Sequence, residues 1–306
     1  MHASFLMADI KQIKWKIQAT DNIKKITNAL EIISTIKLQK IKHSTIQIRE
    51  CMLSLLDIIM CVDKTHSLFH SQKSTGEKRL VIVLWSEKWL CGSLNTTLFK
   101  KIHNTFGDFQ DKTDIYVVWK KAKEYFTRRN YTVVWSTSIW DNITPTAHRD
   151  LLTYIDTVRA SWQYNRIYIC YNVFKNTMKY LPVVFSLFPL IQLKLKTFLA
   201  EMHYEHLTKH KKIIKKPLSE TELLIEPSTE IVQEKLYNMM MHYIVYGAIL
   251  QNKTCEFSAR MLAMKWAKDN ATSQITKLKL SYNKARQDGI TKEIIEIAGA
   301  KAIVAG

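Results

Sequence analysis

The sequence predicts an α/β protein in which two long terminal helices form an antiparallel coiled coil around an inserted α/β domain. Apolar residues recur at helical spacing towards both ends, whereas the middle alternates short β-type runs with helical stretches. Only seven glycines and five prolines interrupt the 306 residues, which favours long elements. We expect a first helix over residues 1–62, an inserted domain with a basic connector over 63–226, and a last helix over 227–306.

The first helix is predicted over Ile10–Val62, where neither glycine nor proline interrupts the chain. About fifty helical residues would extend ~75 Å, at 1.5 Å per residue, well beyond a small domain. Spacings of three, four and seven residues predict a coiled-coil seam. Its members are Ile10, Ile13, Ile17, Ile23, Ile26, Leu30, Ile33, Ile41, Ile48, Met52, Leu55 and Ile59.

The middle of the chain alternates two kinds of segment, which predicts βαβ units and therefore a Rossmann-like domain. Runs rich in β-branched and aromatic residues predict strands at Leu80–Trp85, Ile115–Trp119, Tyr131–Trp135 and Ile167–Tyr171. Helices are predicted between them at Asn95–His103, Lys121–Arg129 and Ala147–Tyr164. The basic stretch His203–Lys216 then leads to the last helix, either as a solvated connector or as a docking strip.

The last helix is predicted to begin after Pro227, with Ser228 as its cap and Glu230 near its first turn. Its alanines recur every four residues, which lets a second helix approach closely because methyl groups replace bulky side chains. Simple helix propensity is the alternative explanation. The row consists of Ala259, Ala263, Ala267 and Ala271.

The formal charge of +18 predicts an anionic partner, which can be an acidic protein, anionic lipid or nucleic acid. On the first helix, basic residues outnumber Asp21, Glu31 and Glu50, so we expect a basic face beside the seam. A merely solvated lysine-rich face is the alternative. The basic residues are Lys11, Lys14, Lys16, Lys24, Lys25, Lys37, Lys40, Lys42 and Arg49.

Motifs for independent chemistry are missing from the sequence. It contains no G-x-x-x-x-G-K-[ST] loop, no H-E-x-x-H pair and no G-x-S-x-G elbow. Five scattered cysteines without a C-x-x-C pair predict reduced thiols rather than disulfides or a zinc site. We therefore expect a chain that is not an enzyme by itself and that binds no cofactor or metal.

No membrane span or targeting segment is predicted. The longest apolar stretch, Leu181–Leu193, contains two prolines and is shorter than the ~20 residues of a spanning helix. The residues before Asp9 resemble neither a secretory signal nor a transit peptide. We expect a soluble chain.

Both ends of the chain carry distinctive sequence motifs. SARMLAMKWAKDNA (Ser258–Ala271) and LSYNKARQDGITKEIIEI (Leu280–Ile297) resemble the C-terminal signature of the gamma subunit of F-type ATP synthases. IKWKIQATDNIKKITNALEIISTIKLQKIK, beginning at Ile13, resembles the N-terminal pattern of that family. In the middle, Trp89 and Ser93 stand where the family has glycines. The matching residues there are Ser86, Leu90, Cys91, Gly92, Leu94, Asn95, Tyr171, Asn172, Phe174, Pro189 and Leu190.

The resemblance implies a divergent gamma subunit, the central rotating shaft that couples ATP synthesis or hydrolysis to proton translocation. It implies alternating alpha and beta subunits around the shaft, with ATP or ADP and Mg bound there, and an epsilon-type subunit and membrane c-ring at the foot. The chain would lie peripherally on the cytoplasmic face of the cell membrane. The implied shaft contacts are Lys24, Lys25, Ile26, Thr27, Leu30, Arg260, Asp269, Asn270, Arg286, Gln287, Thr291 and Glu293.

Three alternatives stay open on the sequence. Asp269 has the simpler explanation of an ion pair with Lys265, four residues earlier on the helix. A specialised F-type-like ATPase that drives a motility or surface apparatus would keep both helices and change the foot. A basic coiled-coil protein that binds nucleic acid would use the charge but leave both end signatures unexplained.

Overall fold

The computed structural model describes residues 2–62, 77–86, 90–137, 148–161, 163–190, 195, 198 and 225–304. The chain divides into two compact units, and both long helices run through both of them. Unit 1 comprises Met1–Thr35 and Met261–Gly306, and unit 2 comprises Ile36–Arg260. The predicted basic connector His203–Lys216 lies outside the described residues.

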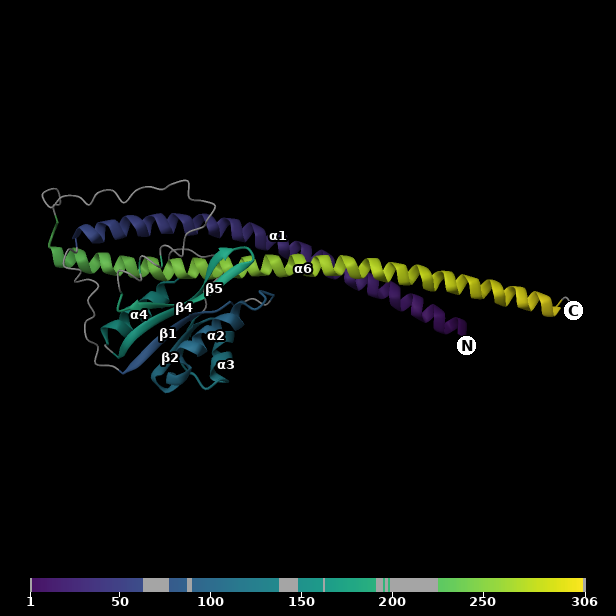
Figure 1. Ribbon diagram of the computed structural model, residues 1–306, viewed down its shortest axis with the longest axis horizontal. Coiled ribbons are helices and arrows are strands. Elements are labelled where there is room, and N and C mark those ends of the chain that lie inside the picture. Colours follow the sequence, from purple (N-terminus) through teal and green to yellow (C-terminus); the bar gives the residue numbers. More distant parts are fainter. Residues whose placement is uncertain are drawn as a thin grey trace. The chain divides into compact units, whose positions relative to one another are not determined.

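The two predicted terminal helices are confirmed as α1, His2–Val62, and α6, Thr229–Val304 (Figure 1). Ser228 caps α6, because its Oγ accepts a hydrogen bond from Ile231 N at 3.4 Å and its carbonyl accepts one from Val232 N at 3.1 Å. Glu230 lies in the first turn, where a negative charge is favoured by the helix dipole.

Unit 2 contains a five-stranded sheet in the order β3-β2-β1-β4-β5. The first four strands are parallel neighbours, and β5 is antiparallel to β4. The strands are β1 Lys78–Leu84, β2 Thr113–Val118, β3 Thr132–Thr137, β4 Tyr164–Asn176 and β5 Lys179–Phe188. The helical elements between them are α2 Leu94–Phe106, the short 3₁₀ helix η2 Gly107–Lys112, α3 Lys120–Thr127 and α4 Arg149–Ala160. The alternation predicted from the sequence is thus confirmed.

The direction of the strand connections places helices on both faces of this sheet. The chain moves outward from β1 to β2 to β3 and then returns across the sheet to β4. Right-handed crossovers therefore put α2 and α3 on one face and α4 on the other. Aromatic contacts agree with this arrangement, because Tyr168 and Tyr116 lie on opposite faces of the sheet. The ring centre of Phe106 in α2 lies 5.1 Å from that of Tyr168, and the ring centre of Tyr154 in α4 lies 4.7 Å from that of Tyr116.

The core of unit 2 lies on the faces of β1 and β2 and extends to both long helices. The side chains of Leu80–Leu84 and Ile115–Val118 are buried almost completely, as expected for parallel strands covered on both sides. The same cluster includes one apolar side of both long helices. Its members there are Met52, Leu55, Leu56, Ile59 and Val62 of α1 and Met240, Met241, Ile244, Val245, Ala248 and Ile249 of α6. Next to α4, the ring of Tyr246 in α6 stacks on His148 at 5.0 Å.

Strand β5 was not predicted, although the sequence drew attention to its apolar run. Its two neighbouring prolines, Pro182 within the strand and Pro189 just after it, weaken a strand pattern. The structure places Pro182 opposite Asn172, in the outermost strand of the sheet. An edge strand tolerates proline because one of its sides makes no ladder hydrogen bonds.

Candidate functional site

In unit 1, the first part of α1 packs against the last part of α6 as an antiparallel pair. The Lys268 ammonium bonds to the Glu31 carboxylate, and a Cβ atom added to Gly289 would lie 3.8 Å from Ile10 Cδ1. From Glu31 to Ile10 the contacts move back along α1 while they move forward from Lys268 to Gly289 on α6. The predicted antiparallel coiled coil is therefore confirmed for this unit.

The buried seam of this pair differs from the predicted one. Ile23, Ile26 and Ile33 were assigned to the seam, but their side chains are 50–60% exposed. Thr27 and Ser34 are buried instead, at 7% and 2% exposure. Their hydroxyls are satisfied within α1, Thr27 Oγ1 at 3.0 Å from the Ile23 carbonyl and Ser34 Oγ at 2.7 Å from the Leu30 carbonyl. Small self-satisfied side chains suit a close helix approach better than isoleucines do.

On α6 the alanine row faces the interior of unit 1 in part. Ala271 is buried, together with Met264, whereas Ala263 and Ala267 are half-buried. Burial thus increases along the row towards Ala271, and at that residue it agrees with the close-packing interpretation. The fourth alanine, Ala259, belongs to unit 2 and is half-buried there.

The predicted shaft contacts fall into three groups by exposure. Thr27 and Arg260 are buried, which leaves their polar atoms to internal partners. Lys24 and Leu30 are half-buried at the margin of the helix pair. The remaining eight residues are exposed and accessible on unit 1: Lys25, Ile26, Asp269, Asn270, Arg286, Gln287, Thr291 and Glu293.

In unit 1, each acidic residue of α1 whose side chain is described forms an ion pair within the chain. Lys25 Nζ lies 2.8 Å from Asp21 Oδ2, and this hydrogen bond holds the pKa of the Asp21 carboxyl below its ordinary value. Glu31 is paired with Lys268. The ion pairs described in unit 1 do not include Asp269, so the simple pairing with Lys265 is not observed. Asp21 and Glu31 are thus both engaged within the chain, while the lysines of this part of α1 outnumber them.

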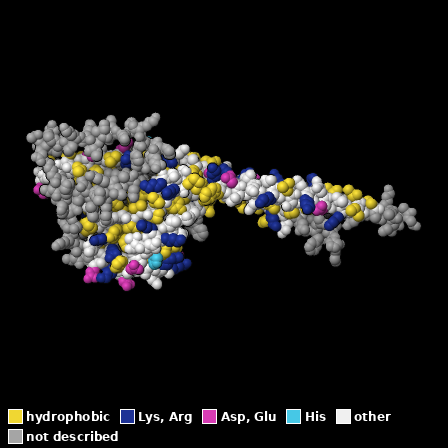
Figure 2. Space-filling model, in the orientation of Figure 1, with side chains coloured by type: hydrophobic (Ala, Val, Ile, Leu, Met, Phe, Trp, Pro, Cys, Tyr) yellow, Lys and Arg dark blue, Asp and Glu magenta, His cyan; other side chains and the backbone are white. Residues whose placement is uncertain are grey.

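Large apolar side chains are exposed next to these lysines. Trp15 is 69% exposed, and Ile23, Ile26, Ile32 and Ile33 are each at least half exposed. Figure 2 shows Lys and Arg side chains interleaved with hydrophobic ones along the visible face of the long helices. Extended apolar surface of this kind marks a site where another protein docks. Together with the lysines it favours a partner that offers both apolar and acidic groups.

In unit 2, the motif residues of the middle of the chain converge on one stretch of α6. Asn95 closes the turn after β1, because its Oδ1 accepts from Ser86 N at 3.0 Å and its Nδ2 donates to Ser86 O at 3.1 Å. Cys91 and Leu94 from this turn share a buried apolar cluster with Phe174 and with Cys255 of α6.

The turn also explains how serine replaces a family glycine. Ser93 has φ −86°, a value open to any residue, whereas Leu90 and Gly92 adopt the left-handed conformation at φ 69° and 62°. The other replaced glycine position, Trp89, lies outside the described residues.

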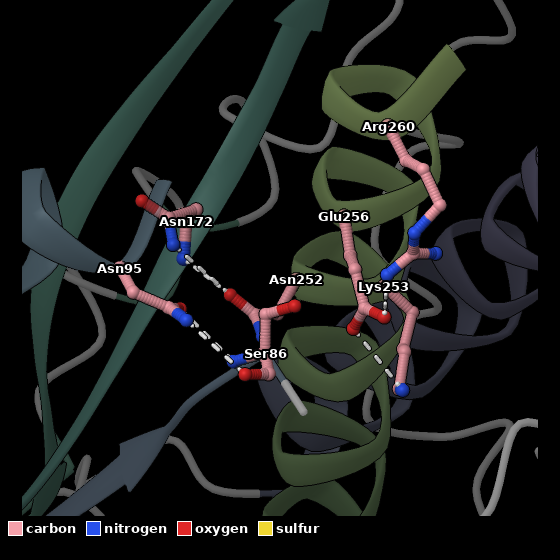
Figure 3. A network of polar contacts seen from close by, with 7 residues as sticks. All are labelled: Ser86, Asn95, Asn172, Asn252, Lys253, Glu256 and Arg260. Carbon is pink, nitrogen blue, oxygen red and sulfur yellow. Dashed lines mark hydrogen bonds and ion pairs between the residues drawn. The ribbon is translucent and has the colours of Figure 1, made fainter. Parts of the chain in front are cut away.

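Side chains of α6 bind the backbone of β4 in the part of that strand that continues beyond the end of β1. Strand β1 pairs with β4 only as far as Cys170. Beyond it, Asn172 N donates to Asn252 Oδ1 at 3.1 Å, and Phe174 N donates to Gln251 Oε1 at 3.1 Å (Figure 3 shows the Asn172–Asn252 contact). Buried backbone donors that would lack a strand partner are thereby satisfied.

Two further α6 side chains extend this contact. Cys255 Sγ donates to Asn172 O at 3.3 Å, and Ser258 Oγ donates to Thr177 O at 3.0 Å, in the turn between β4 and β5. We call Gln251–Arg260 the junction segment. Its polar face lies along the β4–β5 hairpin over more than two helical turns.

The junction segment also holds a buried group of three charges. Glu256 is completely buried, and its two carboxylate oxygens lie 2.8 Å from Arg260 Nη2 and 3.1 Å from Lys253 Nζ (Figure 3). The Lys253 ammonium lies 4.6 Å from the centre of the Trp119 ring, directly after β2. Trp119 has φ 104°, a strained value for a tryptophan.

Arg260 was predicted to contact a partner through an accessible guanidinium. The structure places it at 6% exposure with its Nη2 bound to Glu256, so in this chain it holds the junction segment together. A sequence signature names a residue without its surroundings, so the burial of Arg260 could not be read from it. Gln251, Asn252, Lys253 and Glu256 were missed. The sequence contains an indication of this segment, because the polar residues Gln251–Thr254 follow a long apolar run in the same predicted helix.

Features of an independent enzyme or a membrane span do not appear in the described part of the chain. No helix there is long and apolar enough to cross a membrane. Within the same residues, no group of three or more His, Cys, Asp or Glu side chains is placed to hold a metal ion. The described residues thus define a class of protein in which two long helices accompany an α/β domain with a five-stranded sheet.

Comparisons with known proteins make this class specific. The family model described as ATP synthase matches residues 9–303. The ATP synthase gamma chain of Buchnera aphidicola subsp. Schlechtendalia chinensis is 31% identical, over 97% of this chain and 99% of its own. The gamma chain of Vesicomyosocius okutanii is also 31% identical, over 97% and 100%. In fold, the chain is similar to a chain of the Euglena gracilis mitochondrial ATP synthase rotor, with TM-score 0.61 and 18% identity over 92% of this chain and 99% of that one.

The chain belongs to the gamma-chain family of ATP synthases. Its role is that of the rotor subunit, which is non-catalytic. Neither a nucleic-acid-binding coiled coil nor a specialised ATPase is favoured by these comparisons.

Proposed function

We propose that this chain is the central shaft of a rotary ATP synthase whose head consists of alternating alpha and beta subunits. The observation that carries the proposal is the exposed strip of α1 in unit 1, where isoleucines alternate with lysines over several turns. An asymmetric surface of this kind can contact three copies of a catalytic subunit unequally. Only unequal contact shifts a partner between conformations. ATP, ADP and Mg are bound by the partner subunits.

The contact set that we propose follows from exposure. Lys24, Lys25, Ile26 and Leu30 of α1 carry apolar and cationic groups towards the head. On α6, Arg286 supplies a planar cation suited to carboxylates, and the amide of Gln287 can donate and accept. The further exposed members are Asp269, Asn270, Thr291 and Glu293. Thr27 and Arg260 are left out because their polar groups are buried within the chain.

We also propose that the α/β domain meets an epsilon-type subunit and a membrane c-ring that conducts protons. The chain would be peripheral, on the cytoplasmic face of the cell membrane. The basic charge of +18 supports contact with acidic protein surfaces in this assembly. No role in nucleic-acid binding is proposed.

Native mass spectrometry of the complex purified through this chain tests the proposal. We expect one copy of the chain with three pairs of nucleotide-binding subunits, an epsilon-type subunit and a c-ring. The same head with other proteins at the foot would replace the c-ring part of the proposal. A complex without such a head would refute the shaft function.

A further inference from the structure

The strand order gives unit 2 a topological switch point between β1 and β4. Strands β2 and β3 lie to one side of β1, and β4 lies to the other. In doubly wound sheets the crevice at the carboxyl ends of the strands next to such a point is the usual ligand site. Here the turn after β1, Trp119 after β2, and Asn172 beyond the β1-paired part of β4 all contact α6 instead.

We propose that the junction segment Gln251–Arg260 occupies this ligand position and forms the joint through which α6 passes torque to the α/β domain. The inference rests on the proposed function, since only a rotating shaft needs such a joint. The residues of the joint are positioning residues, because they act by holding the helix.

The contact resists sliding of α6 along its axis. Gln251, Asn252, Cys255 and Ser258 share one side of α6, at spacings of one, three and three residues, and each bonds a main-chain atom between Asn172 and Thr177. Main-chain atoms of a paired hairpin do not change rotamer. A shift of α6 along its axis would therefore break all four bonds together.

The contact also resists turning of α6 about its axis. Each residue of a helix is rotated about 100° from the previous one, so a small turn of α6 carries Asn252 away from the hairpin and Lys253 away from Trp119. Glu256 and its two cations would then need another buried polar environment. The neighbouring surface is apolar, formed by Cys91, Leu94 and Phe174. A low local dielectric makes the separation of this group unfavourable.

The buried charges attach α6 to the sheet at a second place. Two cations share one buried carboxylate, and Lys253 has the Trp119 ring as an additional partner. The cation–π contact joins α6 to the end of β2, whereas the amide bonds join it to β4. The helix is thus held at two separate places on the carboxyl edge of the sheet, and two separated attachments transmit rotation where one would act as a pivot.

The experiment compares ATP hydrolysis with ATP-driven proton pumping in the complete complex reconstituted into lipid vesicles. Asn252→Leu keeps the approximate size of the side chain and removes the acceptor for Asn172 N. We expect hydrolysis within twofold of the unsubstituted complex and at least a fivefold loss of protons pumped per ATP hydrolysed. Glu234→Gln, at an exposed position of α6 in the same unit, is the control and should change neither quantity.

A reversible cross-link separates a joint from a general loss of folding. Ser258→Cys and Thr177→Cys are combined, at positions where Ser258 Oγ lies 3.0 Å from Thr177 O, and are joined by a short cleavable thiol reagent. Each single substitution is a control. In Asn252→Leu, the link should restore pumping and its cleavage should abolish it again. Where Asn252→Leu does not assemble, the link in the otherwise unchanged complex should leave pumping intact, since a joint does not move during turnover.

The outcomes are distinct. Unchanged pumping in Asn252→Leu, a loss that the link does not reverse, or inhibition of the otherwise unchanged complex by the link would each overturn the joint. An unsubstituted complex that neither hydrolyses ATP nor pumps protons would instead refute the proposed function.

Discussion

At the scale of single residues, Glu256 has the most demanding environment in the described chain, since its completely buried carboxylate serves two cations. Breaking a buried ion pair by removing one partner typically costs 3–5 kcal/mol, about the loss we expect in the free energy of unfolding of Glu256→Gln. Lys253→Met should cost less, because it leaves one cation for one carboxylate. Urea unfolding of the full chain measures both, and an effect of Glu256→Gln no larger than that of Glu234→Gln would contradict the account.

His148 makes a pH-dependent contribution to the free energy of unfolding. Burial, with a smaller contribution from the charge of His242, lowers the pKa of His148 to about 4. Because the folded pKa lies below the ordinary 6.5, the unfolded chain takes up the proton first. The contribution is therefore complete above pH 6.5 and is lost as the pH falls towards 4, up to about 3 kcal/mol.

The test of this contribution is the pH dependence of unfolding in His148→Phe, whose ring can keep the stack on Tyr246 without titrating. We expect a flatter slope of unfolding free energy between pH 6.5 and 4 than in the unsubstituted chain. The exposed His43→Gln should retain the original slope. Identical slopes for all three would show that His148 is not the group responsible.

At the scale of elements, Gly289 in α6 can accept a side chain. An added Cβ atom would meet Ile10 Cδ1 at 3.8 Å, an ordinary contact, and alanine is favoured over glycine in a helix by about 1 kcal/mol. Gly289→Ala should raise the melting temperature of the chain. Gly107→Ala is a matched comparison, because its Cβ would lie 3.2 Å from the His103 ring, and no gain is expected there. Equal gains at both positions would contradict the contact argument.

The elements were largely predictable because their signals are local. Helical spacing gave α1 and α6, and β-branched runs gave four of the strands. The antiparallel β5 was missed because Pro182 is acceptable only at an edge, and the edge position is a property of the whole sheet. Similarly, the choice of Thr27 over Ile26 for the seam depends on how closely α6 approaches, which one helix alone does not specify.

The site was less predictable than the fold. Sequence signatures pointed to Arg286 and Gln287, which are exposed, and equally to Arg260, which is buried. The difference arises from Glu256, four residues earlier on α6, whose buried carboxylate binds the Arg260 guanidinium. Sequence reasoning located the important segments but did not separate internal contacts from external ones.

At the scale of the whole molecule, the proposed shaft surface predicts unequal effects of exposed substitutions. Gln287→Leu removes an exposed amide that we assign to a partner contact, whereas Lys40→Ala removes an exposed charge outside the proposed set. We expect Gln287→Leu to reduce assembly or coupled ATPase activity severalfold and Lys40→Ala to leave both near the original values. Equal assembly and activity in the two purified complexes would count against the contact assignment.

The hairpin between β4 and β5 is held by α6 through its main chain, and this has a consequence for how such a protein can diversify. Amide and carbonyl groups of Asn172, Phe174 and Thr177 are the same whatever side chains the hairpin carries. Its outward side chains, such as the exposed Met178 and Leu181, are free to change without loosening the helix. A lineage can therefore refit this surface to a new neighbour while the mechanical connection behind it stays constant.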